Sequence, residues 1–379
     1  MSLKINVTSR ILSESADSCL GQSEQVFLRG STQKAPLGAF CFCYTIFMEI
    51  ILKEIKVLYG LELSFVEKIT KGTATENVVL TDNSIKYFLK RHSFNSLERV
   101  KEVHSAKHFF AEKGMPVILP MMQNNGETCF FCSGNYFALF PFIEGLQVEQ
   151  AQHTENSVIS MAEMLAKFHK AGAKSDLVVK DSYYTPVNTQ ISIENIERIL
   201  EKIDSLEKVT KLDTLVREDL FLKKKLLKVK DFSLENVSLQ NDHLIHGDYL
   251  DHNLFFDSHG HVSHIFDFEK AQYAPRVYEV VRSMMYSFLS KEFTDKEMSY
   301  AKLYIDSYRK IYPLSSEELR IGLSIYYIKY IHTVWLENEY YIKNNIRVFE
   351  YLKDSSRRLH FLVEKRDQLS DFLRRDFDF

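Results

Sequence analysis

The first part of the chain has short apolar segments separated by turns, a pattern typical of strands. Two pairs of these segments flank tight turns, Asp82-Asn83-Ser84 and Gly134-Asn135, and therefore predict two hairpins. Residues 96–113 between the hairpins predict one helix, which should end at Gly114 before Pro116. The predicted strands are residues 62–70, 77–81, 85–91, 128–133 and 136–143. Together these elements predict a small α+β unit.

Beyond Gly145 the pattern changes, because apolar residues recur at helical spacing. Examples are Val158, Met161, Ala162, Leu165 and Phe168. We therefore predict three parts: an N-terminal extension over residues 1–45, with poor hydrophobic periodicity, a β-rich lobe and hinge over 46–145, and a helical lobe over 146–379.

The most apolar stretch, residues 37–52, contains Glu49 and is shorter than the roughly 20 residues that span a bilayer. It predicts a short buried or interfacial element, and the polar N-terminus lacks the apolar segment of a secretory signal. The formal net charge of −3 offers no basic surplus for nucleic acid. Five cysteines in 379 residues favour a reducing compartment. We expect a cytoplasmic protein with neither nucleic acid nor membrane as a partner.

The segment from His243 to Ala274 carries the candidate chemistry. Two short apolar strands flank the turn Asp257-Ser258-His259-Gly260, so the hairpin should bring Asn253 and Asp267 together at its open end. Amide and carboxylate oxygens suit a hard cation such as Mg²⁺. Asp248 lies five residues before Asn253 on the entering loop, where it could orient or deprotonate an attacking hydroxyl.

This segment resembles the superfamily of aminoglycoside phosphotransferases, choline kinases and homoserine kinases, the small-molecule relatives of protein kinases. The matching pattern is His246-x-Asp248, then Asn253 after four residues and Asp267 further on. The resemblance implies a bilobal α+β fold, Asp248 as the catalytic base, and Asn253 and Asp267 as ligands of Mg²⁺. The alternative is a purely structural role, in which Asp248 caps a turn and Asn253 forms hydrogen bonds with backbone groups. His246 is expected to brace the loop.

The same resemblance implies a nucleotide site in the β-rich lobe. Lys90 at the end of a strand would hold phosphates, and Glu102 in the following helix would orient it, with Glu98 as a rival. Lys90 and Glu102 could instead be ordinary solvated residues. The phosphate loop would include Gly72 and Thr73, although it has only one glycine, and Phe142 and Ile143 would form the adenine-binding hinge. ATP is the expected cofactor, with GTP left open.

The leading hypothesis is an ATP-dependent kinase that phosphorylates a hydroxyl of a small molecule. An alternative is a nucleotide-binding protein of the same fold that has lost catalysis. A protein kinase ranks last, because Gly247 replaces the usual Arg and Glu269 replaces the Gly of Asp-Phe-Gly. The acceptor stays open among aminoglycosides, amino alcohols such as choline or homoserine, and sugars. A cationic acceptor could contact acidic and aromatic residues, unless these only pack or face solvent. The candidates are Tyr278, Glu279, Trp335, Glu337 and Tyr340.

Overall fold

The computed structural model describes residues 37–69, 77–148, 152–179, 187–229, 242–289 and 294–375. These residues form two compact units. The first contains the described residues up to His104 together with Leu119–Ile143. The second contains Ser105–Ile118 and the described residues from Glu144 onwards. The chain therefore passes between units at Ile143–Glu144, next to the predicted hinge.

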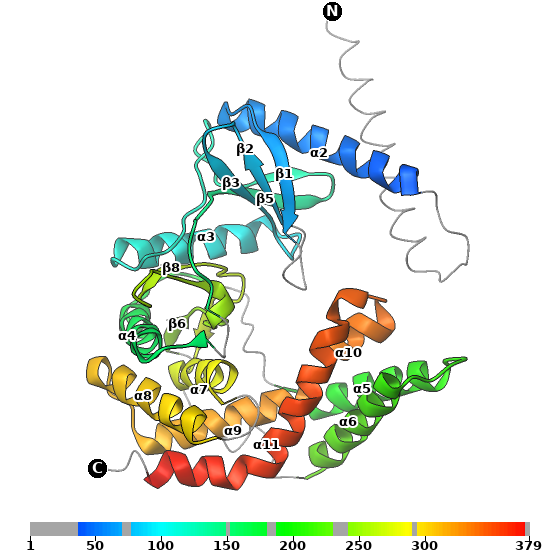
Figure 1. Ribbon diagram of the computed structural model, residues 1–379, viewed down its shortest axis with the longest axis vertical. Coiled ribbons are helices and arrows are strands. Elements are labelled where there is room, and N and C mark those ends of the chain that lie inside the picture. Colours follow the sequence, from blue (N-terminus) through cyan, green and yellow to red (C-terminus); the bar gives the residue numbers. More distant parts are fainter. Residues whose placement is uncertain are drawn as a thin grey trace, which may run out of the picture. The chain divides into compact units, whose positions relative to one another are not determined.

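A five-stranded antiparallel sheet in the order β1-β2-β3-β5-β4 forms the centre of the first unit (Figure 1). Its strands are β1 (Ser64–Ile69), β2 (Asn77–Thr81), β3 (Lys86–Arg91), β4 (Phe130–Cys132) and β5 (Asn135–Pro141). Both predicted hairpins are present, and their turns use left-handed residues, Asn83 at φ 76° and Gly134 at φ 77°. Phe88 on β3 is paired with Phe140 on β5, so β3 is a central strand.

Helix α2 (Leu37–Tyr59) packs on this sheet. Met48, Ile51, Ile55 and Tyr59 recur at helical spacing and are buried with Leu80, Leu89 and Leu139 of the strands. The predicted boundary between residues 45 and 46 falls inside this helix. Within the part of the chain that the structure describes, no helix is both long enough and apolar enough to cross a membrane.

The predicted helix 96–113 is confirmed as α3 (Leu97–Glu112). Ser96 Oγ accepts a hydrogen bond from Arg99 N at 3.2 Å at its start, and Gly114 follows its end at φ 79°. Residues of α3 belong to both units, because the division falls after His104.

Helices dominate the second unit (Figure 1). Thr154, Thr210, Thr294 and Ser315 each begin a helix with a reciprocal capping box, which satisfies backbone donors of the first turn. The α-helices are α4 (Glu155–Gly172), α5 (Thr189–Asp204), α6 (Lys211–Leu227), α7 (Arg276–Ser287), α8 (Asp295–Ile311), α9 (Ser316–His332), α10 (Trp335–Glu337) and α11 (Phe349–Arg375). A π-turn (Asn338–Ile342) and a 3₁₀ turn (Ile346–Val348) connect α10 to α11.

Two short antiparallel pairs of strands lie within this helical unit. They consist of β6 (His243–Ile245) with β9 (Gln272–Ala274), and β7 (Leu254–Phe256) with β8 (Val262–Ile265). Phe110 stacks on Phe168 of α4 with ring centroids 3.5 Å apart, and both rings contact Phe268 beside the hairpin. This buried aromatic cluster fixes the strand ends that carry the candidate chemistry.

Candidate active site

The loop that follows β6 carries Asp248, and its path depends on Gly247. Gly247 has φ 80°, and a Cβ there would lie 1.9 Å from the carbonyl oxygen of Lys270. No other residue fits this position without moving backbone. The loop then forms a 3₁₀ turn at Asp251–Asn253 and enters β7.

His246 braces this loop, as expected. Its Nε2 lies 2.8 Å from the carbonyl oxygen of Phe266, and its Nδ1 lies 3.2 Å from the N–H of Asp248. The first contact needs a proton on Nε2 and the second needs a lone pair on Nδ1, so both are made by neutral imidazole. Burial lowers the pKa of His246, which also favours the neutral form.

Glu279 of α7 forms hydrogen bonds with the backbone of the same loop. Its carboxylate accepts hydrogen bonds from the N–H groups of His246 at 3.0 Å and Tyr249 at 3.4 Å, and it contacts His169 Nε2 at 3.0 Å. Burial alone would raise the pKa of Glu279, but its contacts with His169 lower it below the ordinary value. Glu279 is 1% exposed. It therefore packs inside the protein and is not an acceptor contact.

The hairpin brings the loop and the Asp267 segment together as predicted. Phe266 donates its N–H to the carbonyl oxygen of Asn253 at 2.9 Å, while its own carbonyl accepts from His246. Asn253 Nδ2 donates to the carbonyl oxygen of Asp248 at 2.9 Å. Asp267 follows directly after Phe266 in the left-handed region, at φ 58°.

These contacts test whether Asn253 and Asp267 suit a divalent cation. The Asn253 amide nitrogen is engaged by Asp248, which leaves the amide oxygen Oδ1 as the atom for a metal. Asp267 adds a carboxylate, so both donors are the hard oxygens that Mg²⁺ prefers. Among the described residues, no cluster of three or more His, Cys, Asp or Glu could hold a metal by itself. The donor set fits a Mg²⁺ whose remaining ligands would be supplied by nucleotide phosphates and water.

Two cations contact the carboxylate of Asp248. Lys270 Nζ donates to Oδ2 at 3.0 Å, and Arg282 Nη2 of α7 lies 2.5 Å from Oδ1. Burial alone would raise the pKa of Asp248, but Arg282 and Lys270 hold it well below its ordinary value. The Arg282 contact is a close ion pair with Oδ1, which is buried.

Sequence reasoning missed both cations. Lys270 comes directly after Asp267-Phe268-Glu269, and only the close approach of Gly247 to Lys270 brings it to Asp248. Arg282 lies 34 positions after Asp248 in the sequence. One signal could have identified it: Tyr278, Arg282 and Tyr286 are spaced by four residues and so share one face of α7.

The predicted nucleotide residues lie in the first unit. Lys90 is on β3, opposite Ala138 of β5, and is 4% exposed, so it is not the solvated strand lysine of the alternative interpretation. Glu102 contacts Arg99 Nη1 of the same helix at 3.2 Å, whereas the rival Glu98 is exposed. Gly72 and Thr73 lie outside the described residues.

The predicted hinge residues Phe142 and Ile143 follow β5 and are both partly exposed. Phe142 donates its N–H to the carbonyl oxygen of Lys86 at 3.3 Å, and Lys86 Nζ lies 5.5 Å from the centroid of its ring. The N–H of Phe142 is thus engaged with β3.

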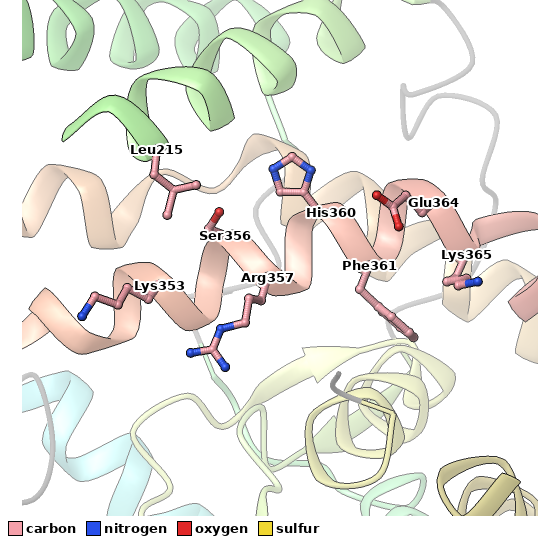
Figure 2. A pocket seen from close by; sticks show the side chains of 8 residues that line it. All are labelled: Leu215, Lys353, Ser356, Arg357, His360, Phe361, Glu364 and Lys365. Carbon is pink, nitrogen blue, oxygen red and sulfur yellow. The ribbon is translucent and has the colours of Figure 1, made fainter. Parts of the chain in front are cut away.

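A separate groove of about 540 Å³ lies between α6 and α11 (Figure 2). Basic side chains of α11 line much of it, and His360 bonds Asp219 of α6 at 2.9 Å across it. None of the predicted site residues lines this groove. Its lining residues are Leu215, Lys353, Ser356, Arg357, His360, Phe361, Glu364 and Lys365.

Comparison with known families gives a match to this chain. The profile of the phosphotransferase enzyme family matches residues 66–314, which include Lys90, Asp248, Asn253 and Asp267. A search of curated proteins by sequence gives no match.

Solved structures of several kinases share the fold at low identity. An amicoumacin kinase in complex with AMP-PNP, Ca²⁺ and Ami is 14% identical, covers 81% of this chain and 92% of its own, and has a TM-score of 0.56. A microcompartment-associated aminopropanol kinase is 12% identical, with 85% and 98% covered and a TM-score of 0.58. Choline kinase from Cryptosporidium parvum Iowa II is 12% identical, with 86% and 97% covered and a TM-score of 0.56. The predicted α+β fold of the protein-kinase type is confirmed.

Proposed function

This chain belongs to the phosphotransferase enzyme family, and we propose that it is an ATP-dependent kinase that transfers the γ-phosphate to a hydroxyl group of a small molecule. The observation that carries the proposal is the arrangement around Phe266. Its two backbone groups bind Asn253 and His246, so one residue connects the Asp248 loop to the Asp267 segment. This connection supports the proposal because it joins the loop of the candidate base, Asp248, to the segments of the two candidate metal ligands.

Asp248 would orient the acceptor hydroxyl and accept its proton. Its Oδ2 accepts from Lys270 and its Oδ1 is paired with Arg282, and a carboxylate oxygen has a second lone pair that could accept a hydrogen bond from a hydroxyl. The two neighbouring cations keep the carboxylate ionised. A carboxylate with so low a pKa is a weak base, so its main contribution would be orientation, with the proton accepted as the oxygen–phosphorus bond forms.

Asn253 Oδ1 and the carboxylate of Asp267 would hold Mg²⁺, which neutralises negative charge on the transferring phosphates. Lys90 would contact the nucleotide phosphates and Glu102 would orient Lys90. The phosphate loop with Gly72 and Thr73, and the hinge at Phe142 and Ile143, complete the proposed nucleotide site. ATP is the proposed phosphate donor, and GTP is the alternative donor to compare with it.

Replacing Asp248 tests this proposal. Asp248→Asn should lower kcat for phosphorylation of a hydroxyl acceptor by about a hundredfold or more, because the amide cannot accept the proton. Binding of Mg·ATP should persist, since Asp248 is not a proposed ligand of either. The measurement is coupled ADP release together with calorimetric titration of Mg·ATP.

Asp354→Asn is the matched control, because this exposed carboxylate on α11 pairs only with the nearby Arg357 among the contacts described. Its kcat should equal that of the wild type. Full turnover by Asp248→Asn would contradict the assignment. Tight binding of Mg·ATP by the wild type, with no transfer to any hydroxyl, would favour the catalytically inactive alternative.

A further inference from the structure

A chain of buried hydrogen bonds begins at Arg276, the first residue of α7, and reaches the loop that carries Asp248. Arg276 Nη1 donates to the hydroxyl oxygen of Tyr308 on α8 at 3.3 Å. That hydroxyl lies 2.9 Å from His169 Nδ1, and His169 Nε2 lies 3.0 Å from the carboxylate of Glu279. Glu279 in turn accepts two backbone N–H groups of the loop. The three linking side chains are at most 1% exposed, so water does not compete for their hydrogen bonds.

Arg276 sets the direction of the protons along this chain. A guanidinium group has donors only, so the hydroxyl oxygen of Tyr308 must accept from it. Among the hydrogen bonds of the described residues, the hydroxyl has one other partner, His169 Nδ1, and therefore donates its own proton there. Nδ1 is then unprotonated, and the proton of the neutral imidazole lies on Nε2, which donates it to Glu279. Burial lowers the pKa of His169, which favours this neutral form.

Arg276 is itself held by the segment between α8 and α9. Its Nη2 donates to the carbonyl oxygen of Pro313 at 2.7 Å and to Glu318 at 3.1 Å. Its guanidinium carbon lies 4.1 Å from the ring centroid of Tyr312, whose hydroxyl is 2.9 Å from Nε2 of His243. His243 begins β6, the strand that leads into the loop. The donor that orients the hydroxyl is thus fixed by three other contacts.

We propose that the Tyr308 hydroxyl is a positioning group for Asp248, to which it is joined through buried neighbours. The hydroxyl keeps the proton of His169 on Nε2 and so keeps Glu279 bound to the loop backbone. This inference rests on the proposed function, because it concerns how the base of the same reaction is held. Without the hydroxyl, the imidazole proton could move to Nδ1, and the lone pair of Nε2 would then face the carboxylate. Two acceptors repel each other, so Glu279 would release the loop.

Tyr308→Phe removes only the hydroxyl and is the direct test. Tyr304→Phe is the matched control, because Tyr304 lies on the same helix and is equally buried. Its hydroxyl donates to Ser283 of α7 at 2.9 Å, outside the chain of hydrogen bonds that begins at Arg276. Each variant loses a buried hydrogen bond of α8, so a merely structural role of Tyr308 predicts similar results for both.

Spectroscopy and amide exchange distinguish the two variants without reference to activity. ¹⁵N NMR of the His169 ring should show an unprotonated Nδ1 in the wild type and in Tyr304→Phe, and the loss of this single tautomer in Tyr308→Phe. His169→Gln identifies the signals of this ring. Exchange of the amide hydrogens of His246 and Tyr249 should become about tenfold faster in Tyr308→Phe alone, the factor expected for one weakened hydrogen bond.

Turnover tests the link to the reaction. It is measured with Mg·ATP and whichever of kanamycin, choline, ethanolamine, homoserine and glucose the wild type phosphorylates. Tyr308→Phe should lower kcat by about tenfold and leave KM for Mg·ATP unchanged, because the loop is displaced while the nucleotide site is not. Tyr304→Phe should keep the kcat of the wild type.

A protonated Nδ1 of His169 in the wild type would overturn the inference, even if Tyr308→Phe failed to fold. Equal amide exchange in the two variants, or a kcat of Tyr308→Phe equal to that of Tyr304→Phe, would also overturn it. No phosphorylated product with the wild type would count against the proposed function instead, while the tautomer and the amide exchange would still decide whether Tyr308 holds the loop.

Discussion

At the scale of residues, the position and charge of Asp248 depend on the side chains that hold its loop. Asp248 is placed by Gly247 before it, by His246 through its own N–H, and by Asn253 through its carbonyl. Its charge is set by Lys270 and Arg282. A substitution at any of these positions acts on Asp248 indirectly.

Gly247→Ala should destabilise the protein by at least about 2 kcal/mol, because the added Cβ would meet backbone 1.9 Å away in addition to the strain of a positive φ. Gly134→Ala is the matched control, since Gly134 has a similar φ of 77° but nothing within 4 Å of its Cβ. Gly134→Ala should lower the free energy of unfolding by only about 1–2 kcal/mol, which is the cost of the positive φ alone. Urea unfolding measures both. Equal losses in the two variants would contradict the close approach of the loop to Lys270.

The spacing of residues along the chain was enough to predict spatial contacts between residues that are also near each other in sequence. Asn253 and Asp267 flank one hairpin, so the turn at Asp257–Gly260 determines that they meet. Lys270 and Arg282 reach Asp248 through tertiary packing, which has no local signature beyond the helical face of α7. For the same reason, the sequence could not show that Glu279 turns inward to His169.

At the scale of elements, buried hydrogen bonds connect α4, α7 and the loop after β6. His169 of α4 contacts both Glu279 of α7 and Tyr308 of α8, at 3.0 Å and 2.9 Å. Burial lowers the pKa of His169, so it is neutral in the folded protein, like His246. These contacts hold the elements around the loop in one arrangement.

Acid should therefore destabilise the protein. His169 and His246 have folded pKa values below their ordinary 6.5, so below this pH the unfolded chain takes up protons that the folded protein excludes. Glu279, whose folded pKa is lowered, adds stability that is lost only as the pH falls below its ordinary 4.5. Urea unfolding should give a falling free energy between about pH 7.5 and pH 5.5.

The variants His169→Gln and His259→Gln show which histidine contributes to the pH dependence of the free energy of unfolding. The first should flatten part of the pH dependence, because Gln cannot be protonated. The second replaces an exposed histidine on the β7–β8 turn and should leave the slope unchanged. A free energy of unfolding that does not change between about pH 7.5 and pH 5.5 would contradict the neutral, buried state of these histidines.

The pattern of the sequence predicted most elements but missed the extent of α2. Residues 37–52 are apolar on nearly all sides, so periodicity does not separate a helix from a buried strand there. The packing of the segment distinguishes the two, because Ile51 and Ile55 lie on one face of a helix against the sheet. Hairpins and capped helices, such as those beginning after Thr154 and Ser315, carry their own local signals.

At the scale of the whole molecule, net charge and composition did not reveal the cations at the proposed site. A chain with a formal charge of −3 places two cations, Lys270 and Arg282, against one carboxylate at the proposed site. The amino-acid composition does not reveal such a local group of positive charges, because acidic residues elsewhere on the chain offset it. Fold class, by contrast, could be predicted, since the change from strand-like to helical periodicity near Gly145 is a property of long segments.

The central claim is that the γ-phosphate of ATP ends on a hydroxyl of a small molecule. Phosphorus NMR of the protein with Mg·ATP and a set of small hydroxyl compounds, including aminoglycosides, amino alcohols and sugars, observes this transfer directly. The account predicts a new phosphomonoester resonance that grows in step with ADP, and that is absent for Asp248→Asn. Formation of ADP with inorganic phosphate alone, or no change in ATP with every acceptor, would contradict it.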